Sequence, residues 1–195
     1  MSEAGEGARL VARQLHAIAS PVRLELMETL RLGGVLSTAE LARRVPDARG
    51  GIQATLSDMA EAGWVRHEEG RGRAATWTAV ENPVRWSDIG PDDEAIRVAQ
   101  TALEQAARQR RFAYIRAFEH EEQTEQWTRE WSEAMVSRDY VELLTPEELT
   151  ELEASFHAAV VDIRTKASQR RETEDSQAAE QPVFLTIMAF PRRSK

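Results

Sequence analysis

The chain contains no cysteine, and this absence removes several classes of function at once. Without a thiol there is no disulfide, no thiolate metal site, no redox switch and no cysteine nucleophile. No stretch reaches the roughly 18 to 20 consecutive apolar residues that a membrane-spanning helix needs. The N-terminal sequence MSEAGEGARL also lacks the basic-then-apolar order of a secretory signal. We therefore expect a cytoplasmic protein that does not bind a membrane.

Catalytic and metal-binding motifs are also missing. The sequence has no phosphate-binding glycine loop, no paired zinc-protease histidines and no nucleophile elbow. Four histidines, His16, His67, His120 and His157, are scattered along the chain. Only His120 has several acidic neighbours, in FEHEEQTE, and a solvated helix end explains these better than convergent metal ligands. We expect no enzyme activity, no catalytic residue, no metal site and no cofactor.

The charge is divided unevenly between the two parts of the chain. The formal net charge is −8. Residues 1–80 contain ten arginines, no lysine and ten acidic residues, whereas residues 81–195 contain fifteen basic and twenty-three acidic residues. An acidic surface repels nucleic acid, but a neutral part with clustered arginines can still bind it locally. A nucleic-acid surface is therefore expected only in the first part.

Residues 9–80 show helical periodicity four times and then a strand pattern twice. The helical segments are residues 9–18, 21–32, 37–45 and 48–62. Alternating stretches begin at Trp64 and Ala75 and flank the glycine-containing sequence EGRGRA, which predicts a hairpin. Ser37 and Glu40 in STAE match a capping box at the start of the third helix. Pro21 suits the first turn of the second helix, and Gly63 the end of the fourth.

The second part begins after a candidate linker, ENPVRWSDIGPDD, at residues 81–93. Residues 92–122 contain no proline or glycine and keep one face apolar, which predicts a single long helix. MVSRDYVELL, residues 135–144, alternates loosely like a strand. Thr145, Pro146 and Glu148 form a strong helix start. PVFLTIMAF, residues 182–190, suits a buried strand.

Three segments of the first part together resemble a winged helix-turn-helix domain and come closest to the ArsR-like bacterial regulators. These segments are ASPVRLELMETL, LSTAELARRV and DARGGIQATLSDMAEAGWVRHEEGRGRAATWTA. The match covers about residues 15–80. The resemblance implies an α+β chain with a DNA-binding domain at 1–82 and a dimerisation and effector domain at 92–195. The second domain is expected to contain the long linking helix and a small α/β unit.

The fourth predicted helix has two different faces. If Ile52, Leu56 and Met59 face the core, a set of polar residues at helical spacing lies on the exposed side. That set is Arg49, Gln53 and Ser57. Arginine and glutamine have the paired donors and acceptors that suit guanine and adenine edges. An ordinary solvated helix face gives the same pattern, so this alternative stays open.

The hairpin tip and two glycines complete the candidate DNA-binding set. Arg71 and Arg73 at the tip suit phosphates or a narrow minor groove, although a charged turn also explains them. Gly50 and Gly51, expected in the first turn of the fourth helix, allow a phosphate to approach its free N–H groups. The full predicted set is Arg49, Gly50, Gly51, Gln53, Ala54, Ser57, Arg71 and Arg73.

The second part leaves two interpretations open for its aromatic residues. They line a pocket for a small apolar effector, or they are ordinary core. The candidate ligand residues are Phe112, Phe118, Trp127, Trp131 and Tyr140. The long helix suits a homodimer interface, and a two-fold dimer binds a palindromic operator on double-stranded DNA.

Two functions follow from these patterns. The first is a homodimeric transcriptional regulator that binds DNA. The alternative is a winged-helix module that binds another protein and little or no DNA, since the ArsR-like family more often has serine or threonine where this chain has Gly50 and Gly51. That family also frequently has a long polar side chain where this chain has Ala54.

Overall fold

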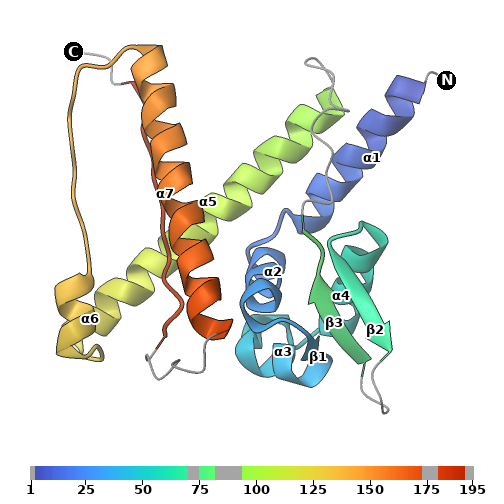
Figure 1. Ribbon diagram of the computed structural model, residues 1–195. Helices are drawn as coiled ribbons and strands as arrows, with labels where there is room; N and C mark the ends of the chain where they lie inside the picture. Colours follow the sequence, from blue (N-terminus) through green and yellow to red (C-terminus); the bar gives the residue numbers. More distant parts are fainter. Residues whose placement is uncertain (1–2, 70–74, 82–93, 173–179, 192–195) are drawn as a thin grey trace. The chain divides into compact units, whose positions relative to one another are not determined.

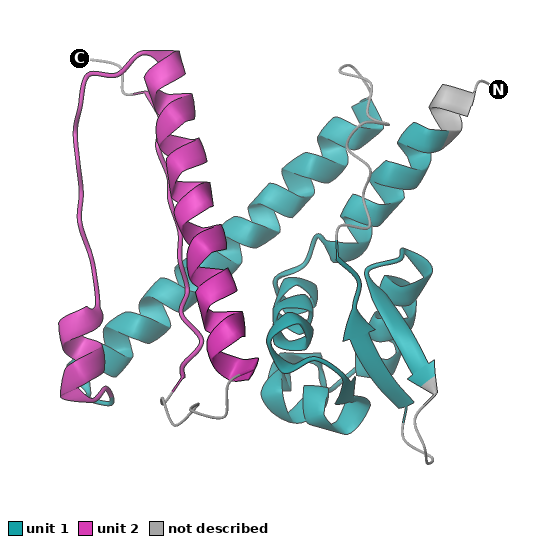
Figure 2. Cartoon of the chain, viewed as in Figure 1, with its two compact units in different colours: residues 1–126 teal, residues 127–195 magenta. Residues whose placement is uncertain are grey.

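The computed structural model describes residues 3–69, 75–81, 94–172 and 180–191 (Figure 1). It combines helices with one small antiparallel sheet, which confirms the predicted α+β class. The chain divides into two compact units, residues 1–126 and 127–195 (Figure 2). This division differs from the predicted domains, because the long helix belongs to the first unit. No helix in the described part of the chain is long and apolar enough to cross a membrane.

Unit 1 contains five α-helices and a short 3-10 helix within its described residues. They are α1 (Glu3–Ile18), α2 (Pro21–Gly33), α3 (Thr38–Arg44), η1 (Pro46–Ala48), α4 (Ile52–Glu61) and α5 (Glu94–Gln123). The first four α-helices fall where the apolar periodicity predicts them, with different ends. The helix α1 begins six residues earlier than expected, and α4 begins four residues later than expected.

The sheet has three strands in the order β1-β3-β2, all antiparallel (Figure 1). The strands are β1 (Leu36–Ser37), β2 (Val65–Glu69) and β3 (Ala75–Ala79). The predicted hairpin of β2 and β3 is confirmed, with Val65 opposite Ala79 and Glu69 opposite Ala75. The strand β1 was not predicted, because two residues are too short to show alternation.

The apolar faces of these elements form one core. Its largest fully buried side chains are Leu15, Leu26, Met27, Leu30, Leu41, Val45, Leu56, Met59 and Ile96. On α2, Met27 and Leu30 are buried, and Leu24 is partly buried. Leu10 on α1 is exposed, whereas Leu15 is fully buried. The two residues are five positions apart, which places them about 140° apart around the helix.

The predicted capping box at the start of α3 is present. The hydroxyl of Ser37 accepts a hydrogen bond from the backbone N–H of Glu40 at 3.2 Å. The Glu40 carboxylate accepts from the backbone N–H of Ser37 at 2.8 Å and from its hydroxyl at 2.6 Å. Two free N–H groups of the helix start are thereby satisfied. The predicted stop at Gly63 is also confirmed, since its φ angle is 82°, and Gly34 after α2 has a φ angle of 70°.

Removing the cap tests its contribution. We expect Ser37→Ala to lower the free energy of unfolding by about 1 kcal/mol, because one donor of α3 loses its partner. Urea denaturation followed by circular dichroism measures this loss. Thr101→Ala is a matched control, since its hydroxyl bonds the carbonyl of Arg97 inside α5 and caps no helix. An equal loss in both variants would contradict a special role for the cap.

The loss of stability in Ser37→Ala should depend on pH, because the Glu40 carboxylate is part of the cap. The hydroxyl and then the backbone N–H of Ser37 hold the pKa of Glu40 below its ordinary value of 4.5. A carboxyl group whose pKa is lowered by folding stabilises the fold above its ordinary pKa, and this contribution disappears as the pH falls through the lowered value. The difference between the wild-type protein and Ser37→Ala should therefore narrow as the pH falls below the ordinary pKa of 4.5.

The first half of α5 is part of the unit 1 core. Ile96, Ala99 and Ala106 are buried, and α5 packs against α1 and α2. Farther along, the hydroxyl of Tyr114 donates to the Glu28 carboxylate at 2.7 Å, and Arg110 lies 3.4 Å from the same oxygen. Burial, and then this hydrogen bond, raise the pKa of Tyr114. These contacts attach α5 to α2.

Unit 2 contains two helices, α6 (Arg129–Ala134) and α7 (Pro146–Glu172), in its described residues. Extended segments precede and follow α7, at residues 135–144 and 180–191 (Figure 1). Neither forms a strand, so the two predicted strands and the predicted small α/β unit are wrong for the described residues. Alternation and β propensity measure how well a segment suits a sheet, whereas a strand also needs a neighbouring strand to pair with.

Candidate nucleic-acid interface

The two faces of α4 differ as the sequence predicts. Ile52, Leu56 and Met59 are buried in the core of unit 1. On the other side, Gln53 and Ala54 are exposed and Ser57 is partly exposed. The solvent side of the helix therefore begins with small and uncharged polar side chains, and the acidic residues Asp58, paired with Arg23 at 2.8 Å, and Glu61 are exposed farther along.

The start of α4 corrects the prediction. The helix begins at Ile52, whereas residues 46–48 form the separate helix η1. Gly50 and Gly51 thus lie before the helix and not within its first turn, so they do not weaken its interior. Pro46 separates η1 from α3, because proline favours the start of a new helix, and a turn at residues 49–51 separates η1 from α4. Arg49 consequently does not lie one helical turn before Gln53 on α4.

The fold itself does not require glycine at these two positions. Gly51 has φ −165°, an extended value that any residue adopts, and neither glycine has a left-handed conformation. A Cβ atom added at Gly50 or Gly51 would find no atom within 4 Å. Both residues are exposed. The backbone at the start of α4 is therefore open to a partner from outside the chain.

Arg49 lies at the junction between α3 and α4. Its Nε donates a hydrogen bond to the carbonyl oxygen of Ala42 at 2.8 Å. This bond satisfies a carbonyl in the last turn of α3, where the helix itself supplies no donor. The side chain remains exposed, and so does Arg43 in the same turn of α3. Two exposed arginines thus precede the start of α4 in the sequence, nine and three residues before Ile52.

Hydrogen bonds connect the sheet to the exposed face of α4. Trp77 on β3 donates through Nε1 to the hydroxyl of Thr38 at 2.9 Å. Thr38 lies 3.5 Å from the amide oxygen of Gln53, at the limit of a hydrogen bond. This contact orients the amide oxygen toward α3 and leaves the amide N–H groups as donors. The sequence did not identify Thr38, because fifteen residues separate it from Gln53.

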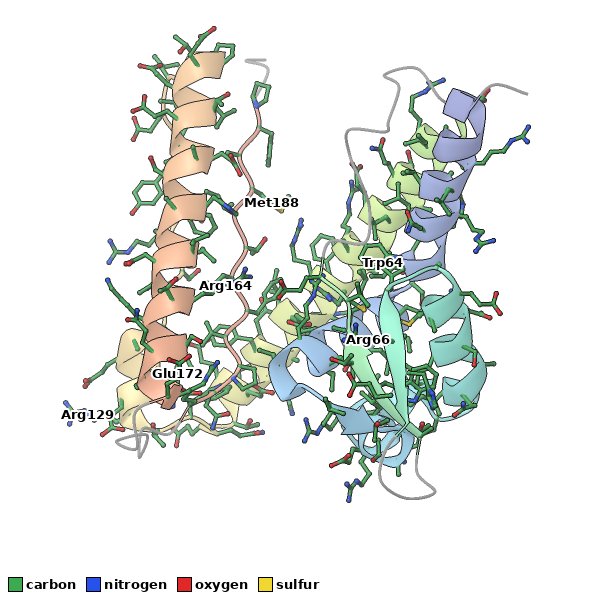
Figure 3. The ribbon with its side chains drawn as sticks, turned by 45° about the vertical axis from the view of Figure 1, so that its right-hand side comes forward. Trp64, Arg66, Arg129, Arg164, Glu172 and Met188 are labelled. Atoms are coloured by element: carbon green, nitrogen blue, oxygen red, sulfur yellow. The ribbon has the colours of Figure 1, made fainter. Side chains whose placement is uncertain are left out.

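The hairpin tip with Arg71 and Arg73 lies outside the described residues. The strands that lead to it are described, and Trp64, just before β2, donates through Nε1 to the carbonyl of Gln14 at 2.7 Å. Arg66 on β2 is exposed and lies 3.6 Å from Glu68 (Figure 3). This exposed cation on the hairpin was not among the predicted site residues, since an alternating strand pattern does not show which polar residue binds a ligand.

The five candidate ligand residues divide between the two units. Phe112 and Phe118 belong to α5 in unit 1, whereas Trp127, Trp131 and Tyr140 belong to unit 2. Phe112 and Tyr140 are exposed and the other three are partly exposed. None of the five is buried as a core residue. In the described part of the chain, no group of three or more histidine, aspartate or glutamate residues is arranged to hold a metal ion.

A comparison with known proteins gives no further assignment for these residues. No protein-family model matches the chain, and no curated protein matches its sequence. The function must therefore be inferred from the geometry of unit 1.

Proposed function

We propose that unit 1 contains a winged helix-turn-helix domain that binds double-stranded DNA, and that the protein is a homodimeric transcriptional regulator of the ArsR-like type. In this proposal α3 and α4 are the helix-turn-helix, α4 lies in the major groove, and β2 and β3 form the wing. The order of two helices, a short strand, two further helices separated by η1, and a hairpin supports this proposal. Cytoplasmic location is part of the same proposal.

The open backbone at Gly50 and Gly51 is the observation that carries the proposal. Two adjacent glycines that the fold does not require leave open space beside the first turn of α4, whose first N–H groups have no partner within the helix. The positive end of the helix dipole lies there, and a phosphate group is the ligand that such a site favours. Arg43 and Arg49 add positive charge along the same part of the chain, and Gln53 presents amide donors on the helix face.

Selection from a random pool of duplex DNA tests the function directly. The full chain should enrich an inverted repeat whose half-sites are about 10 base pairs apart, because a two-fold dimer places its recognition helices about one helical turn apart. Affinity for the selected sequence should fall steeply as salt is added. A pool that shows no enrichment at low salt would overturn the proposal.

Adding a methyl group at Gly50 and at Gly51 tests DNA binding without removing a contact that stabilises the fold. In the variant with Gly50→Ala and Gly51→Ala, the free energy of unfolding should stay the same or rise by up to about 1 kcal/mol. DNA affinity should fall about tenfold, because two methyl groups hinder a charge-assisted hydrogen bond to phosphate. Urea denaturation and fluorescence anisotropy measure the two effects.

Gly7→Ala is the matched control, since an added Cβ also meets no atom there and the residue lies in α1. It should leave DNA affinity unchanged. If the double variant binds DNA as tightly as the wild-type protein, the phosphate contact at this helix start does not exist.

Two observations favour the alternative of a protein-binding module. Ala54 lies in the middle of the exposed face of α4 and has no side-chain group that forms a hydrogen bond to a base edge. Residues 1–80 also have no net charge. A module of this kind would enrich no sequence from the random DNA pool at low salt. It would instead bind a defined protein through the same face of α4.

A further inference from the structure

The second half of α4 carries negative charge on its solvent side. Asp58 lies five residues after Gln53, so it is about 7.5 Å farther along the helix axis. Its side chain is 58% exposed. A free carboxylate this close to a base contact lies within the Debye length of the DNA phosphates, about 10 Å at 0.1 M salt, and repels them. If α4 enters the major groove, this charge therefore needs a counterion from the chain itself.

Arg23, in the first turn of α2, supplies this counterion. One of its terminal nitrogens, Nη2, donates a hydrogen bond to the Asp58 carboxylate at 2.8 Å. The other, Nη1, donates to the carbonyl oxygen of Ala17 at 2.8 Å. Ala17 lies in the last turn of α1, where the helix itself supplies no donor. Because the guanidinium group is planar and rigid, the bond to Ala17 also fixes the arm that binds Asp58. The carboxylate is thus held on the side of α4 that faces α2.

Separate contacts hold the end of α4 in place. Two side chains of α1 donate to carbonyl oxygens there, Arg13 to that of Glu61 at 3.2 Å and Gln14 to that of Ala62 at 3.3 Å. The apolar face of α4 is buried in the core as well. The position of α4 therefore does not depend on Arg23 alone. Removal of Arg23 should change the charge beside α4 more than it changes the position of the helix.

We propose that Arg23 is a positioning residue for DNA binding, which neutralises the Asp58 carboxylate and holds it away from the DNA phosphates. This role rests on the proposed function, in which α4 lies in the major groove. It differs from the role of Gln53, because Arg23 acts through Asp58 and not on a base. It also explains how a recognition helix can carry an acidic residue beside its DNA-binding face.

Charge removal in the full chain tests this role. Arg23→Gln should weaken binding to the selected DNA sequence about tenfold at low salt, because an unpaired carboxylate then lies beside the phosphates. Asp58→Asn, added to the same chain, should restore most of the affinity, because no carboxylate remains. Asp58→Asn alone should bind at least as tightly as the wild-type protein. Fluorescence anisotropy measures all four affinities.

A purely structural role of Arg23 predicts a different result. Arg23→Gln also removes the bond to Ala17, and Asp58→Asn does not replace that bond. A loss of affinity caused by a displaced α4 would therefore persist in the double variant. It would persist at high salt too, whereas repulsion from an exposed carboxylate is screened. A double variant that binds as weakly as Arg23→Gln at every salt concentration overturns the proposed role.

Arg23→Lys tests the same role without removing the charge. A lysine keeps the counterion for Asp58, although its single ammonium group lacks the fork that bonds Ala17 and Asp58 together. We expect this variant to keep DNA affinity within about threefold of the wild-type value, well short of the tenfold loss in Arg23→Gln. Urea denaturation shows whether each variant is folded. A folded Arg23→Lys that loses tenfold or more overturns the role of the charge, even if Arg23→Gln does not fold.

Arg31→Gln is the matched control, since it removes the same charge from an exposed position near the other end of α2. Its effect on DNA affinity should be much smaller than that of Arg23→Gln. Equal losses in the two variants would show that only the net charge of unit 1 matters, and would overturn the role of Arg23. If the wild-type chain enriches no duplex sequence, the proposed function and this role fail together. If the wild-type chain binds DNA and Arg23→Gln binds equally tightly at low salt, only the role of Arg23 is overturned.

Discussion

Replacing Leu56 with alanine is expected to lower the free energy of unfolding by about 3 to 5 kcal/mol. Leu56 is fully buried in the core of unit 1, at the middle of α4. The substitution removes apolar contacts and leaves a cavity, because a helix packed between other elements closes the space only partly. Urea denaturation of the full chain, followed by circular dichroism, measures the change in the transition of unit 1.

Leu32 provides a matched control for this substitution. It is also a helical leucine of unit 1, but its side chain is 63% exposed. Leu32→Ala should change the free energy of unfolding by less than about 0.5 kcal/mol. Equal losses at the two positions would show that α4 does not pack into the core as described. In that case the opposite face of α4 would have no fixed orientation for binding.

The second large effect concerns DNA binding and depends on the proposed function. Gln53→Glu should weaken binding to the selected DNA sequence about tenfold or more. The substitution replaces the amide donors with a carboxylate, so a base contact worth about 1 to 3 kcal/mol is lost and repulsion from phosphates is added. Fluorescence anisotropy at constant salt measures the affinity. The position is exposed, so the fold should persist.

Gln105→Glu makes the same chemical change at an exposed position of α5. It alters the net charge equally, but it lies outside the proposed recognition surface. Its effect on DNA affinity should be small, and it should vanish first as salt is added, since distant exposed charges are screened. Comparable losses in the two variants would mean that only the total charge matters and that Gln53 does not contact a base.

Local signals of the sequence predicted much of unit 1. The capping box of Ser37 and Glu40, the proline at the start of α2 and the stop at Gly63 all depend on neighbouring residues, and all three are present. The buried face of α4 was also predicted, because helical spacing alone determines which residues share a face. Gln53 and Ser57 are accordingly on its solvent side.

The errors arose where distant parts of the chain decide the structure. The start of α4 depends on how the backbone turns after η1, and helical periodicity continues unchanged through Arg49 and both glycines. The strand β1 exists because Leu36 and Ser37 meet Trp77 and Thr76, about forty residues away. The contact between Thr38 and Gln53 has the same origin. No local pattern contains this information.

The sequence by itself determined the elements whose energetics are local: the caps, the helix faces, the glycine turns and the hairpin. It also determined the absence of thiol chemistry. Only the tertiary structure decided that α5 packs with α1 and α2, that Arg49 bonds to the end of α3, and that residues 182–190 remain extended with their side chains exposed. The reason is that periodicity reports which side of an element is apolar, whereas the surface that covers this side is supplied by residues far away in the chain or by another molecule.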